Sequence, residues 1–433
     1  ADLVQPVMHQ GPAAHDEPMI ELSVYDSLFR AADSICVHTP EELETVRRRF
    51  RFDPFDPAFT TSPYEQYARL RDEDPVHWSE LLWGWVITRY DDVATVLREP
   101  TMSSDVARAT PTPITELELQ ALADHVRAAR TIVHLDDPDH GRVRRLMAEP
   151  FRVREVDRLR TLIDERVAAA ADRLAAQQRD SHVGRIDLVA DFAYPLPVEI
   201  FSSWLGVPEE DAPQFRTWTS WVARSRDPLP AEERAEFFAA LDAMYDHLDA
   251  QVALRRQHPR GDLLTHLVTA EIDGQRLAHD ELMAQLITLY MAGHEPTAGL
   301  VGNGVLALLR HPDQLRRLRD EPTLLRGAVS ELLRYDGPNQ FVRRITTQPM
   351  VLQDTEIPAG AVLYVGLAAA NRDPRRWGDT ADAVVVDRPD AADHLQFGSG
   401  AHACLGAHLA RLQAERMLDT VLTRINRKAR IVI

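Results

Sequence analysis

Most of the chain carries apolar residues at the three- and four-residue spacing of amphipathic helices. Such spacing gathers the apolar side chains into one stripe that packs against a core. It predicts helices at roughly 90–98, 138–150, 153–177, 209–223, 232–257, 278–310 and 323–335. Another helix is expected to begin directly after Cys404, where Leu405, Leu409 and Leu412 recur at helical spacing.

Shorter segments predict a minor β part. Val76-His-Trp78 and Trp85-Val-Ile-Thr88 have the composition of short strands. Met350 to Val365 alternates around Pro358-Ala-Gly360, which predicts a hairpin with its turn there. Ser103 to Ile114 is rich in Ser, Thr and Pro and predicts a loop. The pattern therefore indicates a mostly α fold with a minor β part.

The domain organisation follows from a change in character near residue 52. Residues 1–51 are acidic, contain scattered Pro and His, and predict an N-terminal extension. Residues 52–433 show no repeat, low-complexity tract or flexible linker, so we expect one large domain. With 433 residues and 45% hydrophobic content, the chain can bury a large core.

Charge and cysteine content exclude several classes of protein. The net charge of −18 argues against nucleic acid and anionic membrane surfaces as partners. Cys36 and Cys404 are far apart and give no disulfide framework. No charged-then-apolar signal sequence opens the chain. We therefore expect a cytoplasmic protein.

The segment Leu282–Leu309 requires a separate test for a membrane span. It exceeds the roughly 20 residues that cross a bilayer, and apart from the phenol of Tyr290 its titratable side chains are His294 and Glu295. These two lie near its middle, and Gln285, Asn303 and several glycines interrupt its apolar character. A long helix through a soluble core is the favoured interpretation.

The segment Phe397-Gly-Ser-Gly-Ala-His-Ala-Cys404-Leu-Gly406 is the main chemical signal. It places a cysteine in a glycine-rich turn before a predicted helix, where backbone N–H groups and the helix dipole favour a thiolate. Glycines without Cβ atoms let the backbone approach a flat object closely. A thiolate presented in this way suits the axial position of an iron porphyrin. A buried cysteine in a capping loop is the plainer alternative.

Charged residues upstream favour the porphyrin interpretation. Glu331 and Arg334 share one helix face at i and i+3 spacing, and Arg388 can complete a buried cluster with them. Two porphyrin carboxylates entering a protein interior need cationic or donor partners. Candidates are His140, Arg144, Arg344 and His394.

With these residues, the chain resembles the cytochrome P-450 family of haem-thiolate monooxygenases in its soluble bacterial form, from about Phe52 to the C-terminus. The resemblance implies one large domain enclosing haem b, with Cys404 as the iron ligand. It implies that Glu331, Arg334 and Arg388 form a structural ion cluster, and that Arg344 rather than Arg343 faces a propionate. The implied haem contacts are His140, Arg144, Ala292, Arg344, His394, Phe397, Gly398, His402, Cys404 and Gly406.

One departure from the family concerns the long helix. The family pattern Ala-Gly-x-acid-Thr-Thr appears here as Ala292-Gly-His-Glu-Pro-Thr297. Pro296 replaces the first Thr, which in the family steadies bound oxygen and helps deliver protons, so Glu295, Pro296 and Thr297 are the candidate catalytic residues. Proline has no N–H, so the carbonyl of Ala292 loses its i+4 donor, and a kink is expected. Either Glu295 and ordered water still relay protons, or oxygen activation is altered.

The resemblance also implies covers and walls for a substrate pocket. The loop from Met102 to about Ala129 and the helix pair within Pro208–Arg256 would cover the pocket. Asn339–Val342 and Leu289–Ala292 would supply its walls, through the candidate residues Leu289, Ala292, Gln340 and Val342.

The expected function is oxidation of a small organic substrate with O2, by C–H hydroxylation or oxidative coupling, in secondary-metabolite biosynthesis. Electrons would come from a separate ferredoxin and reductase, because the chain has no flavin or iron–sulfur motif. The ferredoxin would dock on a basic patch, and a monomer is expected. Alternatives are a peroxide-driven or oxidative-coupling enzyme of the same fold, and a non-catalytic partner of a biosynthetic enzyme. The arginines of the expected patch are Arg142, Arg145, Arg375, Arg376 and Arg411.

Overall fold

The computed structural model describes residues 52–54, 56, 59, 61–110, 131–180, 185–223, 231–424 and 430–432. The predicted extension (residues 1–51) and residues 111–129 of the predicted covering loop lie outside these ranges.

Helices form most of the described chain, so the predicted mostly α fold is confirmed. The predicted helices are all present, with ends shifted by a few residues and with the 153–177 helix split after Asp157. The helices are α4 (Tyr64–Glu73), α5 (Tyr90–Arg98), α7 (Asp139–Ala148), α8 (Val153–Asp157), α9 (Arg160–Asp180), α10 (Pro195–Leu205), α11 (Ala212–Ala223), α12 (Ala231–Gln257), α13 (Leu263–Thr269), α14 (His279–Arg310), α15 (Pro312–Asp320), α16 (Leu325–Asp336), α17 (Leu367–Ala370), α18 (Pro374–Trp377) and α19 (Ala407–Arg424).

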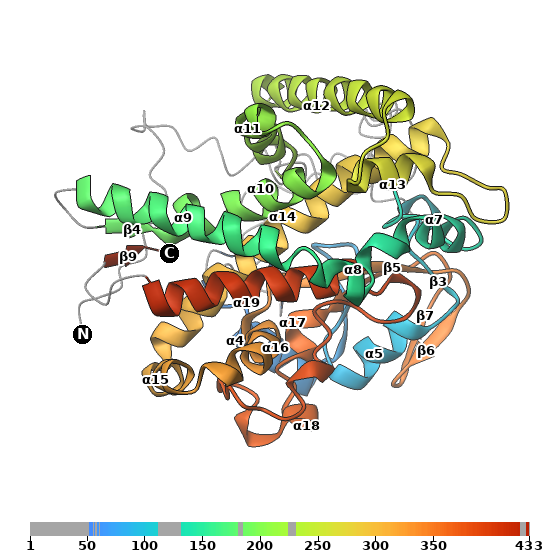
Figure 1. Cartoon of the computed structure of the whole chain (residues 1–433). Coiled ribbons are helices and arrows are strands. Elements are labelled where there is room, and N and C mark those ends of the chain that lie inside the picture. Colours follow the sequence, from blue (N-terminus) through green and yellow to red (C-terminus); the bar gives the residue numbers. More distant parts are fainter. Residues whose placement is uncertain are drawn as a thin grey trace.

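The β part is small and divided, and in the view of Figure 1 its strands lie on both sides of the helices. Five of the described strands form one mixed sheet in the order β1-β2-β8-β5-β3. The predicted strands near Trp78 and Trp85 are confirmed, and these two residues pair across β1 and β2. The strands are β1 (Val76–Ser79), β2 (Gly84–Ile87), β3 (Met102–Ser103), β4 (Arg185–Asp187), β5 (Phe341–Thr346), β6 (Met350–Leu352), β7 (Thr355–Ile357), β8 (Val362–Gly366) and β9 (Arg430–Val432).

The predicted hairpin around Pro358-Ala-Gly360 is wrong. The chain turns earlier, at Gln353 and Asp354, so that β6 pairs with β7 in a sheet of its own. Gln353 adopts a left-handed backbone with φ of 51° and donates a side-chain hydrogen bond to Asp92. After Gly360, β8 pairs with β5 and β2 instead. Pro358 and Gly360 lie where the chain passes from one sheet to the other. The alternation of apolar and polar residues does not distinguish such a connection from a hairpin turn.

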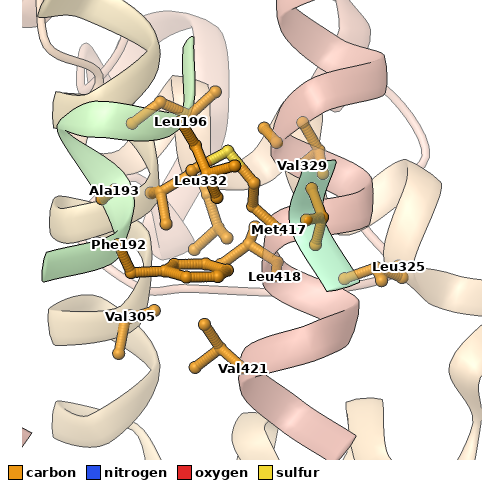
Figure 2. Packing of buried hydrophobic residues seen from close by; sticks show 14 of the residues in the cluster. Phe192, Ala193, Leu196, Val305, Leu325, Val329, Leu332, Met417, Leu418 and Val421 are labelled. Carbon is orange, nitrogen blue, oxygen red and sulfur yellow. The ribbon is translucent and has the colours of Figure 1, made fainter. Parts of the chain in front are cut away.

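The largest core lies where α10, α14, α16 and α19 meet the short π-helical turn Val189–Ala193. Figure 2 shows Phe192 lying among side chains of these helices, with Leu332 and Met417 close by. All three are almost fully buried. A buried side chain of this size contributes about 1.5–3 kcal/mol, so this core fixes α14 relative to α16 and α19.

Helix α14 is the central element of the fold. It packs against α10, α11, α12, α16 and α19, and it runs diagonally behind α10 in Figure 1. The predicted long helix 278–310 is therefore confirmed as a core helix. Within the described ranges, no helix combines the length and apolar character that crossing a membrane requires.

Candidate functional site

The glycine-rich segment forms a tight loop that ends at the start of α19. Gly398 and Gly400 have φ angles of 67° and 71°, in the left-handed region that glycine adopts without strain. The loop is closed by the N–H of Cys404, which donates to the carbonyl of Phe397 at 2.8 Å. A Cβ on Gly400 would lie 2.6 Å from the carbonyl oxygen of Leu97, at the end of α5. The glycine pattern thus shapes the loop and allows α5 to pack against it.

Cys404 is a free cysteine whose side chain is accessible, although protein surrounds much of it. Burial raises the pKa of the Cys404 thiol, while the N–H of Gly406 and the guanidinium groups of Arg144 and Arg411 lower it. The balance leaves this pKa above its ordinary value. The helix start therefore acts in the direction expected from the sequence, but burial outweighs it. A cation bound at the sulfur would reverse that balance.

Four cationic or donor side chains gather beside this loop, and we call them the donor group: His140 and Arg144 of α7, Arg344 of β5 and His402. The rings of His140 and His402 are 4.0 Å apart. Arg144 donates to the carbonyl of Ala403 at 2.7 Å. Burial lowers the pKa of all four, that of His402 to about 4. Both histidines are therefore neutral donors near pH 7.

The donor group has unused hydrogen-bonding capacity. His140 is 2% exposed and its Nε2 has no hydrogen-bond partner among the described residues. Arg344 is 8% exposed and donates to the carbonyl of Arg343 at 2.7 Å. In the described part of the chain, no ion pair joins a carboxylate to Arg144 or Arg344; Asp136, which raises the pKa of Arg344 through its charge, is paired with Arg108. Buried donors in this state are suited to an anionic ligand.

The structure does not bring His394 into the donor group. Its charged neighbours are Arg411 and Arg334, and burial lowers its pKa to about 3. Its Nδ1 accepts from the N–H of Gln396 at 3.2 Å. The sequence analysis placed His394 with Arg144 and Arg344, whereas in the structure these two arginines act on His402.

Glu331, Arg334 and Arg388 lie in contact, as the sequence predicted, and we call them the ion cluster. Glu331 accepts from Arg334 at 2.7 and 2.9 Å and from Arg388 at 3.0 Å. Arg334 also donates to three carbonyl groups, and the N–H of Val385 donates to Glu331. Glu331 and Arg334 are at most 1% exposed. The cluster is thus satisfied by protein groups alone.

The candidate catalytic segment lies in the middle of α14, and the helix continues through Pro296. Ala292 and Glu295 are exposed, while Thr297 is buried and donates from Oγ1 to the carbonyl of Gly293 at 3.1 Å. The hydroxyl of Thr297 is therefore directed into its own helix. The expected kink at Pro296 stays a prediction.

A contact that the sequence did not reveal joins α14 to the start of α10. The Nε2 of His294 is 3.0 Å from the carbonyl of Tyr194. Because a carbonyl only accepts, Nε2 carries the proton and Nδ1 is the free acceptor. The two rings also meet at 4.1 Å and 70°. No sequence signal links these residues, which are 100 positions apart.

The predicted pocket residues have different surroundings. Leu289 packs against the α11–α12 side of the core, and Val342 packs beside the sheet. Gln340 accepts from the hydroxyl of Tyr67 at 2.9 Å, which holds its side chain toward α4. The predicted covering helices are present as α11 and α12, both packed on α14. Their role as a cover stays a prediction.

The arginines of the predicted basic patch are mostly accompanied by carboxylates. Arg142 bonds to Glu281 through both terminal nitrogens. Arg375 contacts Asp72 and Asp373, and Arg376 contacts Asp390 and Asp393. Arg145 lies 4.0 Å from Asp273 and is 63% exposed. Arg411 stacks on the ring of Phe397 at 4.4 Å. The local charge here is thus closer to balanced than the arginines alone suggest.

Comparison with known proteins identifies the class to which this arrangement belongs. A family model described as "Cytochrome P450" matches residues 86–429, which include all of the donor group, the ion cluster and Cys404.

Characterised relatives match over most of the chain. The cytochrome P450 monooxygenase PikC of Streptomyces venezuelae is 40% identical over 371 residues, covering 84% of each chain. The vitamin D(3) 25-hydroxylase of Pseudonocardia autotrophica is 37% identical, covering 83% of this chain and 86% of that protein. Among solved structures, the bacillaene polyketide synthase cytochrome P450 PksS of Bacillus subtilis superposes with a TM-score of 0.76 at 31% identity. It covers 86% of this chain and 91% of PksS.

Proposed function

Because the chain belongs to the cytochrome P450 family, we propose that it inserts oxygen from O2 into a C–H bond of a small organic molecule in secondary-metabolite biosynthesis. The family makes it an oxidoreductase, a monooxygenase that binds haem b through a cysteine thiolate. Relatives named for polyketide and vitamin D chemistry support a hydrophobic substrate of moderate size.

The observation that carries the proposal is the pairing of Cys404 with the donor group. In the proposal, Cys404 ligates the haem iron, whose positive charge lowers the thiol pKa that burial raises. His140, Arg144, Arg344 and His402 would hold the two propionates. The unused donors of His140 and Arg344 fit two buried carboxylates. The residues present therefore fit haem b.

The remaining residues act by positioning and by exclusion of water. The haem supplies reductive activation of dioxygen and hydrogen abstraction from the substrate. In the proposal, Leu289, Ala292 and Val342 would hold the substrate, with Gln340 fixed by Tyr67 at the edge of the pocket. The helices α11 and α12 cover the pocket and exclude water. Glu295 moves protons toward the oxygen-binding face of α14.

Pro296 supports a second candidate function, a peroxide-driven or oxidative-coupling reaction. Pro296 offers neither N–H nor hydroxyl, and the Thr297 hydroxyl is already engaged with Gly293. The Pro296→Thr variant restores a hydroxyl at this position. If oxygen activation is altered in the wild type, the variant forms more product per NADPH consumed. Unchanged coupling and unchanged product would remove this candidate.

Electrons are proposed to come from a small acidic ferredoxin that docks on the Cys404 side. Arg145 is the best probe, because it is exposed while Arg142 is engaged with Glu281. The Arg145→Glu variant should be reduced more slowly by ferredoxin at low salt and at an unchanged rate by dithionite. Equal slowing with both reductants would contradict docking at this face.

The proposed function is tested in two steps. The reduced, CO-bound protein should show the absorption band of a thiolate-ligated haem, and Cys404→Ser should lose it. A panel of polyketides, steroids and terpenoids is then screened for a Soret shift, and each binder is incubated with NADPH, reductase and ferredoxin. An oxygenated product from a binder supports the proposal. A thiolate band without any NADPH-dependent product, or with product from hydrogen peroxide alone, would overturn it.

A further inference from the structure

A polar cavity lies on the side of α14 that faces α9, α10 and α11. Its volume is about 390 Å³. Exposed Asp191 and the half-exposed Arg173 and Arg216 line its rim, and both arginines bond to Glu199. Tyr194 and His294 line it toward α14. A space of this size with so many polar groups is large enough for several water molecules.

The cavity adjoins the candidate catalytic segment. Successive residues of a helix are separated by about 100°, so Glu295 lies about 60° from Ala292 and about 100° from His294. His294 lines the cavity, and Ala292 lies on the exposed face where oxygen is expected to react. Glu295 is therefore between the two faces of α14.

Tyr194 lines the cavity, contacts His294 and lies within electrostatic reach of Glu295. Its ring lies against His294 at 4.1 Å, and its carbonyl holds the Nε2 of His294. Burial raises the pKa of the Tyr194 phenol, and the negative charge of Glu295 raises it further. The phenol thus lies within electrostatic reach of the carboxylate and carries its proton at neutral pH.

Proton supply is needed because monooxygenation consumes two protons. One substrate C–H, one O2, two electrons and two protons give one hydroxylated product and one water. Within Ala292–Thr297, Pro296 carries no proton, and the hydroxyl of Thr297 donates to Gly293. His294 is neutral, because burial lowers its pKa to about 4. Glu295 is thus the remaining proton carrier of this segment.

We propose that water in this cavity supplies protons to Glu295 through the hydroxyl of Tyr194, with His294 as the residue that positions the Tyr194 backbone. This inference rests on the proposed function. In this inference the hydroxyl that passes protons to Glu295 comes from Tyr194, at the start of α10, because the segment Ala292–Thr297 of α14 has no free hydroxyl.

The first test measures proximity without turnover. In the reduced, CO-bound holoprotein with ¹³Cζ-labelled tyrosine, the Tyr194 signal is identified by its loss in Tyr194→Phe. This signal should shift in Glu295→Gln, because a neighbouring negative charge has been removed. An unchanged Tyr194 signal would overturn the inference.

The second test uses O2 itself as the probe, with NADPH, ferredoxin and reductase and without organic substrate. Two electrons and two protons convert O2 to hydrogen peroxide, and four of each convert it to two waters. Tyr194→Phe should lower the rate of water formation about tenfold, less than for a directly donating group, since water still fills the cavity. The fraction released as peroxide should rise, and the solvent deuterium isotope effect should change.

Two variants complete the design. Ala190→Trp narrows the rim of the cavity and should reproduce the effect, because Ala190 is an exposed lining residue. Tyr364→Phe is the matched control, since it removes a half-buried hydroxyl that donates to the carbonyl of Leu82, far from α14 in the sheet. Identical water formation in the wild type, Tyr194→Phe and Ala190→Trp would overturn the inference. Absence of the thiolate band in the wild type would instead remove the proposed function.

Discussion

The ion cluster and the donor group are both largely buried sets of charged or polar side chains, but they differ in how their hydrogen bonds are satisfied. In the ion cluster, Glu331 accepts from two arginines and a backbone N–H, and Arg334 fills its remaining donors with carbonyl groups. In the donor group, Arg344 has a single carbonyl partner, and the Nε2 of His140 has none in the described part of the protein. The hydrogen bonds of the ion cluster are all made by protein groups, whereas the donor group keeps donors without a partner among the described residues.

This difference separates a folding role from a binding role. A buried charge without a partner is costly, so removing one member of a cluster that is complete without a ligand destabilises the fold. A set with unused donors costs free energy until an anion arrives, and the binding of that anion recovers the cost. Removing a charge should therefore harm folding in the first set and ligand retention in the second.

The largest effect is expected from Glu331→Gln, which leaves Arg334 and Arg388 buried without their carboxylate. Breaking such a pair costs about 3–5 kcal/mol, so the free energy of unfolding of the holoprotein in urea should fall by that amount. The control is Asp387→Asn, which breaks an exposed pair with Arg317 and should cost about 0–1 kcal/mol. If both variants lost the same free energy of unfolding, the proposed difference between buried and exposed ion pairs would be wrong.

A smaller but more specific effect is expected from Arg344→Leu. A hydrogen bond to a charged group contributes about 1.5–3 kcal/mol, so haem should transfer to an acceptor globin about 10- to 150-fold faster. The protein without haem should be as stable as the wild type or more stable, because a buried unpaired guanidinium has gone. A loss of stability without faster haem transfer would place Arg344 with the ion cluster instead.

His294 belongs to neither set, and burial lowers its pKa although the hydrogen bond to Tyr194 raises it. Its pKa is lowered to about 4, so the unfolded chain binds a proton below about pH 6.5 that the folded chain does not. Its contribution to stability is present above pH 6.5 and is lost as the pH falls toward 4. Relative to the wild type, His294→Asn should gain about 1.4 kcal/mol between pH 7.5 and pH 5.5, measured by urea unfolding. A parallel loss of stability in both proteins would contradict this assignment.

The sequence predicted a large part of this architecture because helical periodicity and the Cys404 frame are local signals. The predicted helices, the strands near Trp78 and Trp85, and the contact of Glu331 with Arg334 required only neighbouring residues. The hairpin prediction failed because the partner of β8 lies in another part of the chain. The contact of Tyr194 with His294 was not predicted for the same reason: only the packing of α10 on α14 brings the two together.

The smallest expected effect is about 1 kcal/mol, the contribution of one neutral hydrogen bond. It tests whether His402 or His394 belongs to the donor group. His402 lies against His140, so His402→Phe should speed haem transfer about fivefold and leave the free energy of unfolding of the haem-free protein unchanged. His394 is buried beside Arg411 and Arg334, so His394→Phe should instead lower that free energy, with haem transfer unchanged. The reverse result would return His394 to the propionates, as its position in the sequence first suggested. His394 lies just before the loop and His402 within it, so their partners in space, and not their spacing from Cys404, give them different roles.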